Sequence, residues 1–177
     1  MSGKRLVVDA CVGSSSGYKE QYPESKYSRE ALLAIKNNHD HILVFTSELS
    51  TEWQNRASRF GTKFRAEMAR KGRTSYVPDD AWRTLMGRCT RVLSTAAEIA
   101  SFEKDFHLVA AALYTDRVIV SNEKNLPNHL ISVRHDVSEV RDLQFGNPRI
   151  EEQICVDWLA AGAPVEIHRA VSSLTPL

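Results

Sequence analysis

The stretch KDFHLVAAALYTDRVIVSNE, residues 104–123, predicts a helix that leads directly into a buried strand. Its first half places apolar residues at helical spacing: Phe106, Val109, Ala110 and Leu113. Its second half contains the unbroken apolar run 118–120, which is typical of a strand buried on both faces of a sheet. We therefore expect a helix followed by a parallel strand.

An acidic residue brackets this unit on either side. Asp105 is expected in the first turn of the helix, and Glu123 follows the strand. A helix that feeds a parallel strand runs antiparallel to it, so both acids are expected at the carboxyl edge of the sheet. That edge is where open α/β sheets bind their ligands.

Apolar runs elsewhere predict the remaining strands of a mainly parallel sheet, at 5–9, 42–46 and 130–134. Segment 10–17, ACVGSSSG, is expected to be a flexible loop. A long amphipathic helix is expected to follow residue 46, with Gly61 as the point where it breaks. The tail from about residue 149 predicts one further helix, which ends near Gly162.

Length and composition are those of one globular α/β domain of 177 residues, with 42% hydrophobic and 25% charged residues. No run is long and apolar enough to span a membrane, and the N-terminus does not resemble a signal peptide, so a cytoplasmic protein is expected. Three widely spaced cysteines give neither a disulfide framework nor a zinc motif.

The formal net charge of +1 conceals a basic middle: residues 51–100 carry ten basic and five acidic side chains. Such a segment is compatible with a polyanionic partner. A solvated helix face explains the same charges equally well.

Acids from four parts of the chain are expected at the carboxyl edge: Asp9, either Glu48 or Glu52, Asp105 and Glu123. Two carboxylates about 4 Å apart repel by roughly 4 kcal/mol at an effective dielectric near 20, so such a cluster requires a cation. Oxygen ligands without His or Cys suit Mg²⁺ or Mn²⁺, which support phosphodiester hydrolysis. The alternative is a set of unconnected helix caps and surface acids.

Four short segments in this order resemble the PIN-domain family: LVVDACV, TSELSTEW, KDFHLVAAAL and DRVIVSNEKNL, within residues 5–134. The resemblance implies a three-layer α/β/α fold and a nuclease that uses Mg²⁺ or Mn²⁺ at a carboxylate cluster. Many members are endoribonucleases, including toxins of bacterial toxin–antitoxin pairs.

Carried over residue by residue, the resemblance assigns the catalytic and metal-binding roles to Asp9, Glu52, Asp105 and Glu123. Glu52 is preferred over Glu48 because it stands six residues after Thr46 and precedes an apolar residue. Glu123 stands where the family usually has Asp.

Three further residues have secondary roles in this assignment. Ser121 replaces the family's Thr and is expected to orient a carboxylate or a water molecule. Asp116 stands at the opposite end of its strand, where a turn role is expected. His107 is expected to be a packed or surface residue rather than a proton donor.

The resulting expectation is an endoribonuclease domain at 1–147 with a helical extension at 148–177. RNA is the expected substrate, and an antitoxin protein and a second copy of the chain are possible partners. Weak candidates for phosphate contacts are Arg56, Arg59, Lys63 and Arg65. The alternatives are a catalytically silent PIN-like RNA-binding or regulatory module and a structure-specific DNA nuclease.

Overall fold

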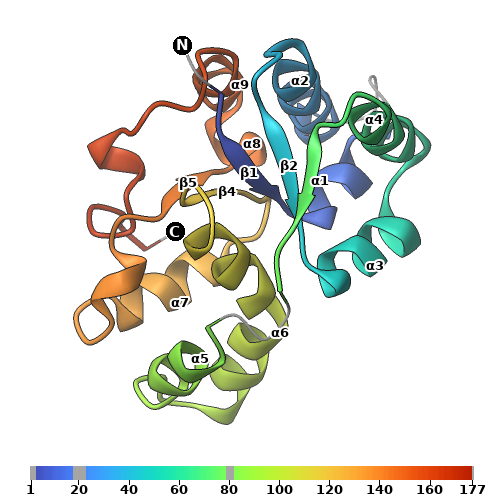
Figure 1. Ribbon diagram of the computed structural model, residues 1–177. Helices are drawn as coiled ribbons and strands as arrows, with labels where there is room; N and C mark the ends of the chain where they lie inside the picture. The colour runs from blue at the N-terminus through green and yellow to red at the C-terminus, as the bar shows by residue number, and fades with distance from the viewer. Residues whose placement is uncertain (1–2, 18–22, 79–81, 177) are drawn as a thin grey trace.

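The computed structural model describes residues 3–17, 23–78 and 82–176 and has five strands in one wholly parallel sheet (Figure 1). Their order is β3-β2-β1-β4-β5. The strands are β1 (Arg5–Val8), β2 (Ile42–Phe45), β3 (Thr74–Tyr76), β4 (Val118–Val120) and β5 (Gln144–Gly146). The central strands β1 and β4 are buried apolar segments. The predicted α/β class with a parallel sheet is confirmed.

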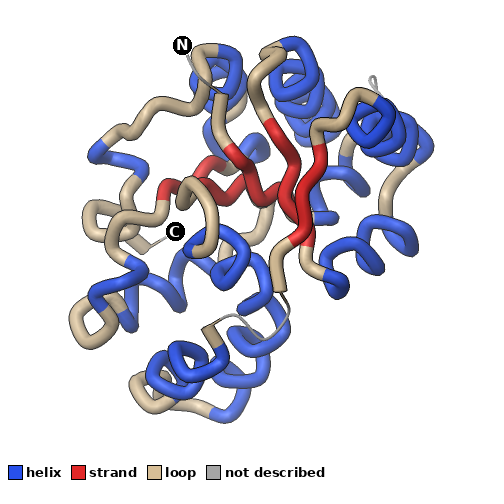
Figure 2. Tube along the Cα trace, in the orientation of Figure 1, coloured by secondary structure: helices blue, strands red, loops and turns tan. Residues whose placement is uncertain are grey.

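Helices cover both faces of the sheet and complete a three-layer α/β/α sandwich (Figures 1 and 2). On one face α2 packs against α1, α4, α8 and α9, and on the other α6 packs against α5 and α7. The α-helices of the described residues are α1 (Ala10–Ser15), α2 (Pro23–Asn37), α3 (Ser47–Arg56), α4 (Arg59–Arg70), α5 (Arg83–Thr90), α6 (Ala96–Leu113), α7 (Asn125–Val133), α8 (Pro148–Glu151) and α9 (Gln153–Ala160). None is long and apolar enough to cross a membrane.

The neighbouring strands β1 and β4 form the switch point of the sheet. The chain leaves β1 toward α1 and α2 on one face, and it leaves β4 toward α7 on the other. Connections that part in this way open a crevice at the carboxyl ends of the two strands, which is where open α/β sheets place a ligand.

The prediction of a strand at 130–134 is wrong, because this segment belongs mostly to α7. Leu126, Leu130 and Val133 are all fully buried at spacings of four and three residues, which is the period of a helix rather than of a strand. The structure instead has strands β3 and β5, whose sequences TSY and QFG contain no apolar run that would have predicted them.

Segment 10–17, predicted as a loop, contains the short helix α1, and Asp9 is its N-cap. The long helix after residue 46 breaks at Ala57 and Ser58 rather than at Gly61, since Ser58 caps α4. Gly61 lies against α1 instead: a Cβ atom there would be 2.6 Å from the carbonyl oxygen of Gly13. Glycine thus permits the close approach of these two helices.

Two further predictions of helix boundaries are wrong. Helix α6 begins at Ala96, where Thr95 and Glu98 form a capping box, so Asp105 lies in the middle of the helix rather than in its first turn. The C-terminal extension is two helices, α8 and α9, separated at Glu152 with φ of 53°.

Candidate functional site

Asp9 lies at the carboxyl end of β1, at the switch point of the sheet, and is only 5% exposed. Its Oδ1 atom accepts a hydrogen bond from the backbone N–H of Cys11 at 3.0 Å, as an N-cap residue does. The indole Nε1 of Trp53 donates to the carbonyl of Val8 at 2.8 Å, which ties α3 to the end of the same strand. These two hydrogen bonds therefore fix the chain immediately before and after Asp9.

Ser121 connects Asp9 to the end of the neighbouring strand β4. Its fully buried hydroxyl donates to Asp9 Oδ2 at 2.6 Å and accepts from the backbone N–H of Glu123 at 3.0 Å. One side chain thus fixes the rotamer of Asp9 and the turn that carries Glu123, which is exposed. This contact matches the orienting role expected for Ser121.

Asp105 faces Asp9 and Glu123 from α6 and is half-buried. Burial raises its pKa to about 6, and the negative charges of Asp9 and Glu123 add to this increase, against the positive charge of Lys104. The helix therefore brings Asp105 into the field of the other two carboxylates, although it does so from mid-helix.

Glu52 lies instead beside His107, which is almost completely buried on α6. Its carboxylate is 3.6 Å from the imidazole Nε2, and this contact holds the pKa of Glu52 below its ordinary value. On the other side of the ring Glu48, with a side chain 59% exposed, is 3.7 Å from Nδ1. Burial lowers the pKa of His107, but the two carboxylates outweigh it and the net shift is upward.

The structure therefore separates the four predicted acids into two groups. Asp9, Asp105 and Glu123 share one electrostatic environment, whereas Glu52 is engaged by His107, two residues from Asp105 along α6. No pattern in the sequence predicts the contact between His107 and Glu52, because the two residues lie on different helices.

Asp116 lies at the opposite, amino edge of the sheet. It accepts hydrogen bonds from the backbone and the guanidinium of Arg5, both at 2.8 Å. This position keeps it away from the other acids.

The four candidate phosphate contacts have different surroundings. Arg65 stacks over the ring of Phe45 and donates to Ser50, so it has a structural role, whereas Arg59 and Lys63 are exposed on α4. Arg56 lines a cavity of about 460 Å³ beside Glu123.

That cavity is the part of the site that sequence reasoning missed. Lys124, Arg149, Ser14 and Ser15 line it together with Arg56. The position of Lys124 directly after Glu123 was the available signal for its part in the site.

The donor set was tested against the divalent cation that the PIN resemblance implies. Carboxylate oxygens are the ligands that Mg²⁺ and Mn²⁺ prefer, and the charges of Asp9 and Glu123 add to the effect of burial on the pKa of Asp105. Within the described residues, however, no three His, Cys, Asp or Glu side chains are arranged closely enough to hold a metal ion. The residue types suit a hard divalent cation, whereas their arrangement in this structure does not form a complete site.

No protein-family model, curated protein or solved structure matches this chain.

Proposed function

We propose that the protein is a Mg²⁺- or Mn²⁺-dependent endoribonuclease that hydrolyses RNA phosphodiester bonds. The observation that carries this proposal is the position of Asp9 and Glu123 after the neighbouring strands β1 and β4, with Asp105 of α6 within their electrostatic reach. Burial raises the pKa of Asp105 and the charges of Asp9 and Glu123 add to this increase. A carboxyl group with a perturbed pKa, at the edge where an open sheet binds its ligand, is typical of a functional site.

In this proposal Asp9, Asp105 and Glu123 hold the divalent ion, which when bound supplies an activated water and stabilises the leaving oxygen. Ser121 fixes Asp9 and the Glu123 turn so that the carboxylates need little reorganisation. Arg56 and Lys124 in the neighbouring cavity are placed to contact the phosphates of a single-stranded RNA.

The test is cleavage of a labelled RNA in Mg²⁺ or Mn²⁺ by the wild type and by Asp9→Asn and Asp105→Asn. Each variant is expected to lose more than about 100-fold in rate, because removing a metal ligand costs at least as much as removing its outer-sphere partner. Asp142→Asn, which changes an exposed carboxylate paired with Arg117, is the matched control. Unchanged cleavage by both site variants would exclude the proposal.

One observation favours the silent RNA-binding module as a second candidate. The described carboxylates do not form a closed metal shell, and Glu52 is held by His107. Calorimetric titration with Mn²⁺ separates the two: a chain that binds RNA but shows no heat with Mn²⁺ and no cleavage is the silent module. Branched DNA offered beside RNA tests the DNA nuclease alternative.

A further inference from the structure

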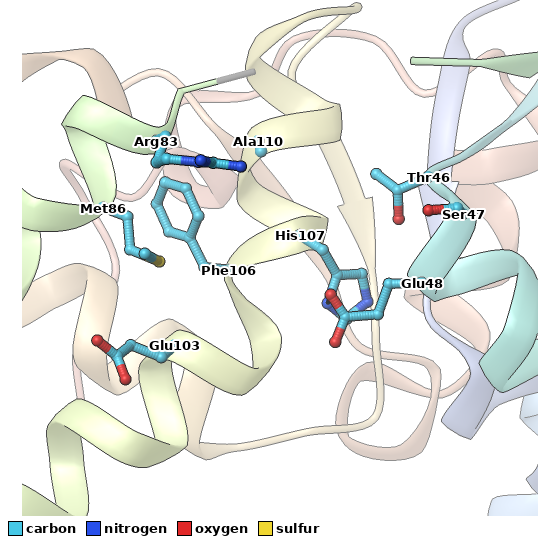
Figure 3. Close-up of a pocket in the computed structure, with 9 residues that line it drawn as sticks. All are labelled: Thr46, Ser47, Glu48, Arg83, Met86, Glu103, Phe106, His107 and Ala110. Atoms are coloured by element: carbon cyan, nitrogen blue, oxygen red, sulfur yellow. Dashed lines mark ion pairs between the residues drawn. The ribbon is translucent and has the colours of Figure 1, made fainter. Parts of the chain in front are cut away.

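A second cavity, of about 220 Å³, lies between the start of α3 and the helices α5 and α6 (Figure 3). We call it the α3–α6 cavity and define it by Glu48, Arg83, Phe106, His107 and Ala110, which line it. His107, one of its walls, lies two residues after Asp105 on α6 and is contacted by Glu48 and Glu52.

Three charged side chains besides His107 line it, and all three are exposed: Arg83, Glu48 and Glu103. Arg83 is exposed and has no ion pair with any described residue. Glu48 contacts His107 through Oε2, and its side chain is otherwise largely exposed. In Figure 3 the guanidinium of Arg83 lies beside the ring of Phe106, while Glu48 lies across the cavity next to His107.

A guanidinium and a carboxylate across one partly apolar cavity match a particular kind of flat ligand. Guanine offers the acceptors O6 and N7 to a guanidinium, and its N1–H and N2–H₂ groups are two donors for a carboxylate. Adenine presents a donor where guanine has O6, and cytosine has only one amino group to donate to a carboxylate. Phe106 and Ala110 are mostly buried but form part of the apolar wall of the cavity, against which the face of a base can lie.

We propose that the α3–α6 cavity binds a guanine base of the RNA, read by Arg83 and Glu48. Phe106 and His107, two walls of the cavity, follow Asp105 directly along α6, so the cavity lies on the same stretch of helix as that acid. This inference rests on the proposed function for its substrate class, but mononucleotide binding tests it separately.

The experiment is calorimetric titration of the full chain with 5′-GMP, 5′-AMP and 5′-CMP in EDTA, so that no divalent ion contributes. GMP is expected to bind at least about tenfold more tightly than AMP or CMP, as one bidentate base contact provides. Arg83→Ala and Glu48→Gln are each expected to remove that preference. Arg91→Ala, at the other end of α5, is the control and is expected to retain it.

Equal binding of the three nucleotides, or a GMP preference that survives both variants, overturns the inference. Amide chemical shifts of α5 and α6 in the wild type, followed during GMP titration, give the same answer if a variant fails to fold. GMP selectivity without RNA cleavage would support guanine binding in the cavity and contradict the nuclease proposal. RNA cleavage together with equal binding of the three nucleotides would contradict only the guanine proposal.

Discussion

Charged side chains at the two edges of the sheet have opposite environments: those at the amino edge have hydrogen-bond or ion-pair partners, and three acids at the carboxyl edge have no ion pair with any described residue. At the amino edge, Arg73 is 8% exposed and donates hydrogen bonds to four backbone carbonyls, those of Ile35, Lys36, Asn38 and His41. These bonds close the C-terminal end of α2 and fix the start of β2. Asp116 is likewise paired with Arg5 at this edge.

At the carboxyl edge, Asp9, Asp105 and Glu123 have no ion pair with any described residue. Burial raises the pKa of Asp105, and the charges of Asp9 and Glu123 add to this increase, with Lys104 as the main opposing charge. Stability alone would not favour this arrangement, because like charges repel and burial penalises an ionised carboxyl group. The difference indicates that the amino edge stabilises the fold, whereas the carboxyl edge carries acids without ion pairs to the described residues where the site is proposed.

The largest effect on stability is expected at the amino edge, from Arg73→Met. The substitution leaves buried carbonyl groups without donors, so the free energy of unfolding should fall by about 3 kcal/mol or more. Urea unfolding measures this loss, with Arg70→Met at an exposed position of α4 as control. A change below about 0.5 kcal/mol would contradict a stabilising role for this edge.

At the carboxyl edge a substitution is expected to raise, rather than lower, the free energy of unfolding. Asp105→Asn should stabilise the metal-free protein at pH 7.5 by about 1–2 kcal/mol, allowing for partial solvent screening of a pKa raised from 3.8 to about 6. The folded state binds this proton more tightly than the unfolded state does. Stability is therefore lost as pH rises from about 4 through 6, and the gain in the variant should largely vanish at pH 4.

Urea unfolding at the two pH values, in EDTA, checks this reversal. Glu103→Gln is the control, since it removes an exposed carboxylate two residues earlier on α6. A destabilised Asp105→Asn protein at pH 7.5 would mean that the carboxyl edge is as well balanced as the amino edge.

The positions of Asp9 and Glu123 at the carboxyl edge could be predicted from the sequence because they depend on β1 and β4. Buried apolar runs mark both strands, so the side chains that follow them, Asp9 and Glu123, had predictable positions. The prediction for Asp105 was partly wrong: the residue lies on the predicted helix, but in the middle of that helix rather than in its first turn.

The remaining features depended on contacts that no local pattern encodes. Strands β3 and β5 at the sheet edges have three residues each, and neither alternates or forms an apolar run. The engagement of Glu52 by His107 joins two helices through side-chain rotamers. Spacing along the chain predicts which edge a residue occupies, but it does not predict which neighbour it contacts there.

The smallest effect is expected for Asp116→Ala, which breaks the partly exposed pair with Arg5 at the amino edge. Burial raises the pKa of Asp116, but the hydrogen bonds and charge of Arg5 outweigh it and leave the pKa below 3.8. A depressed carboxyl pKa stabilises the fold above that value and ceases to do so as pH falls through the folded-state pKa. The free energy of unfolding of the variant should therefore fall by about 0.5–1 kcal/mol at pH 7, and by less in high salt. A double-mutant cycle with Arg5→Ala measures the energy of this pair. Asp105→Asn should be stabilised at the same pH. If both substitutions changed the free energy of unfolding in the same direction, the contrast between the two edges would be contradicted.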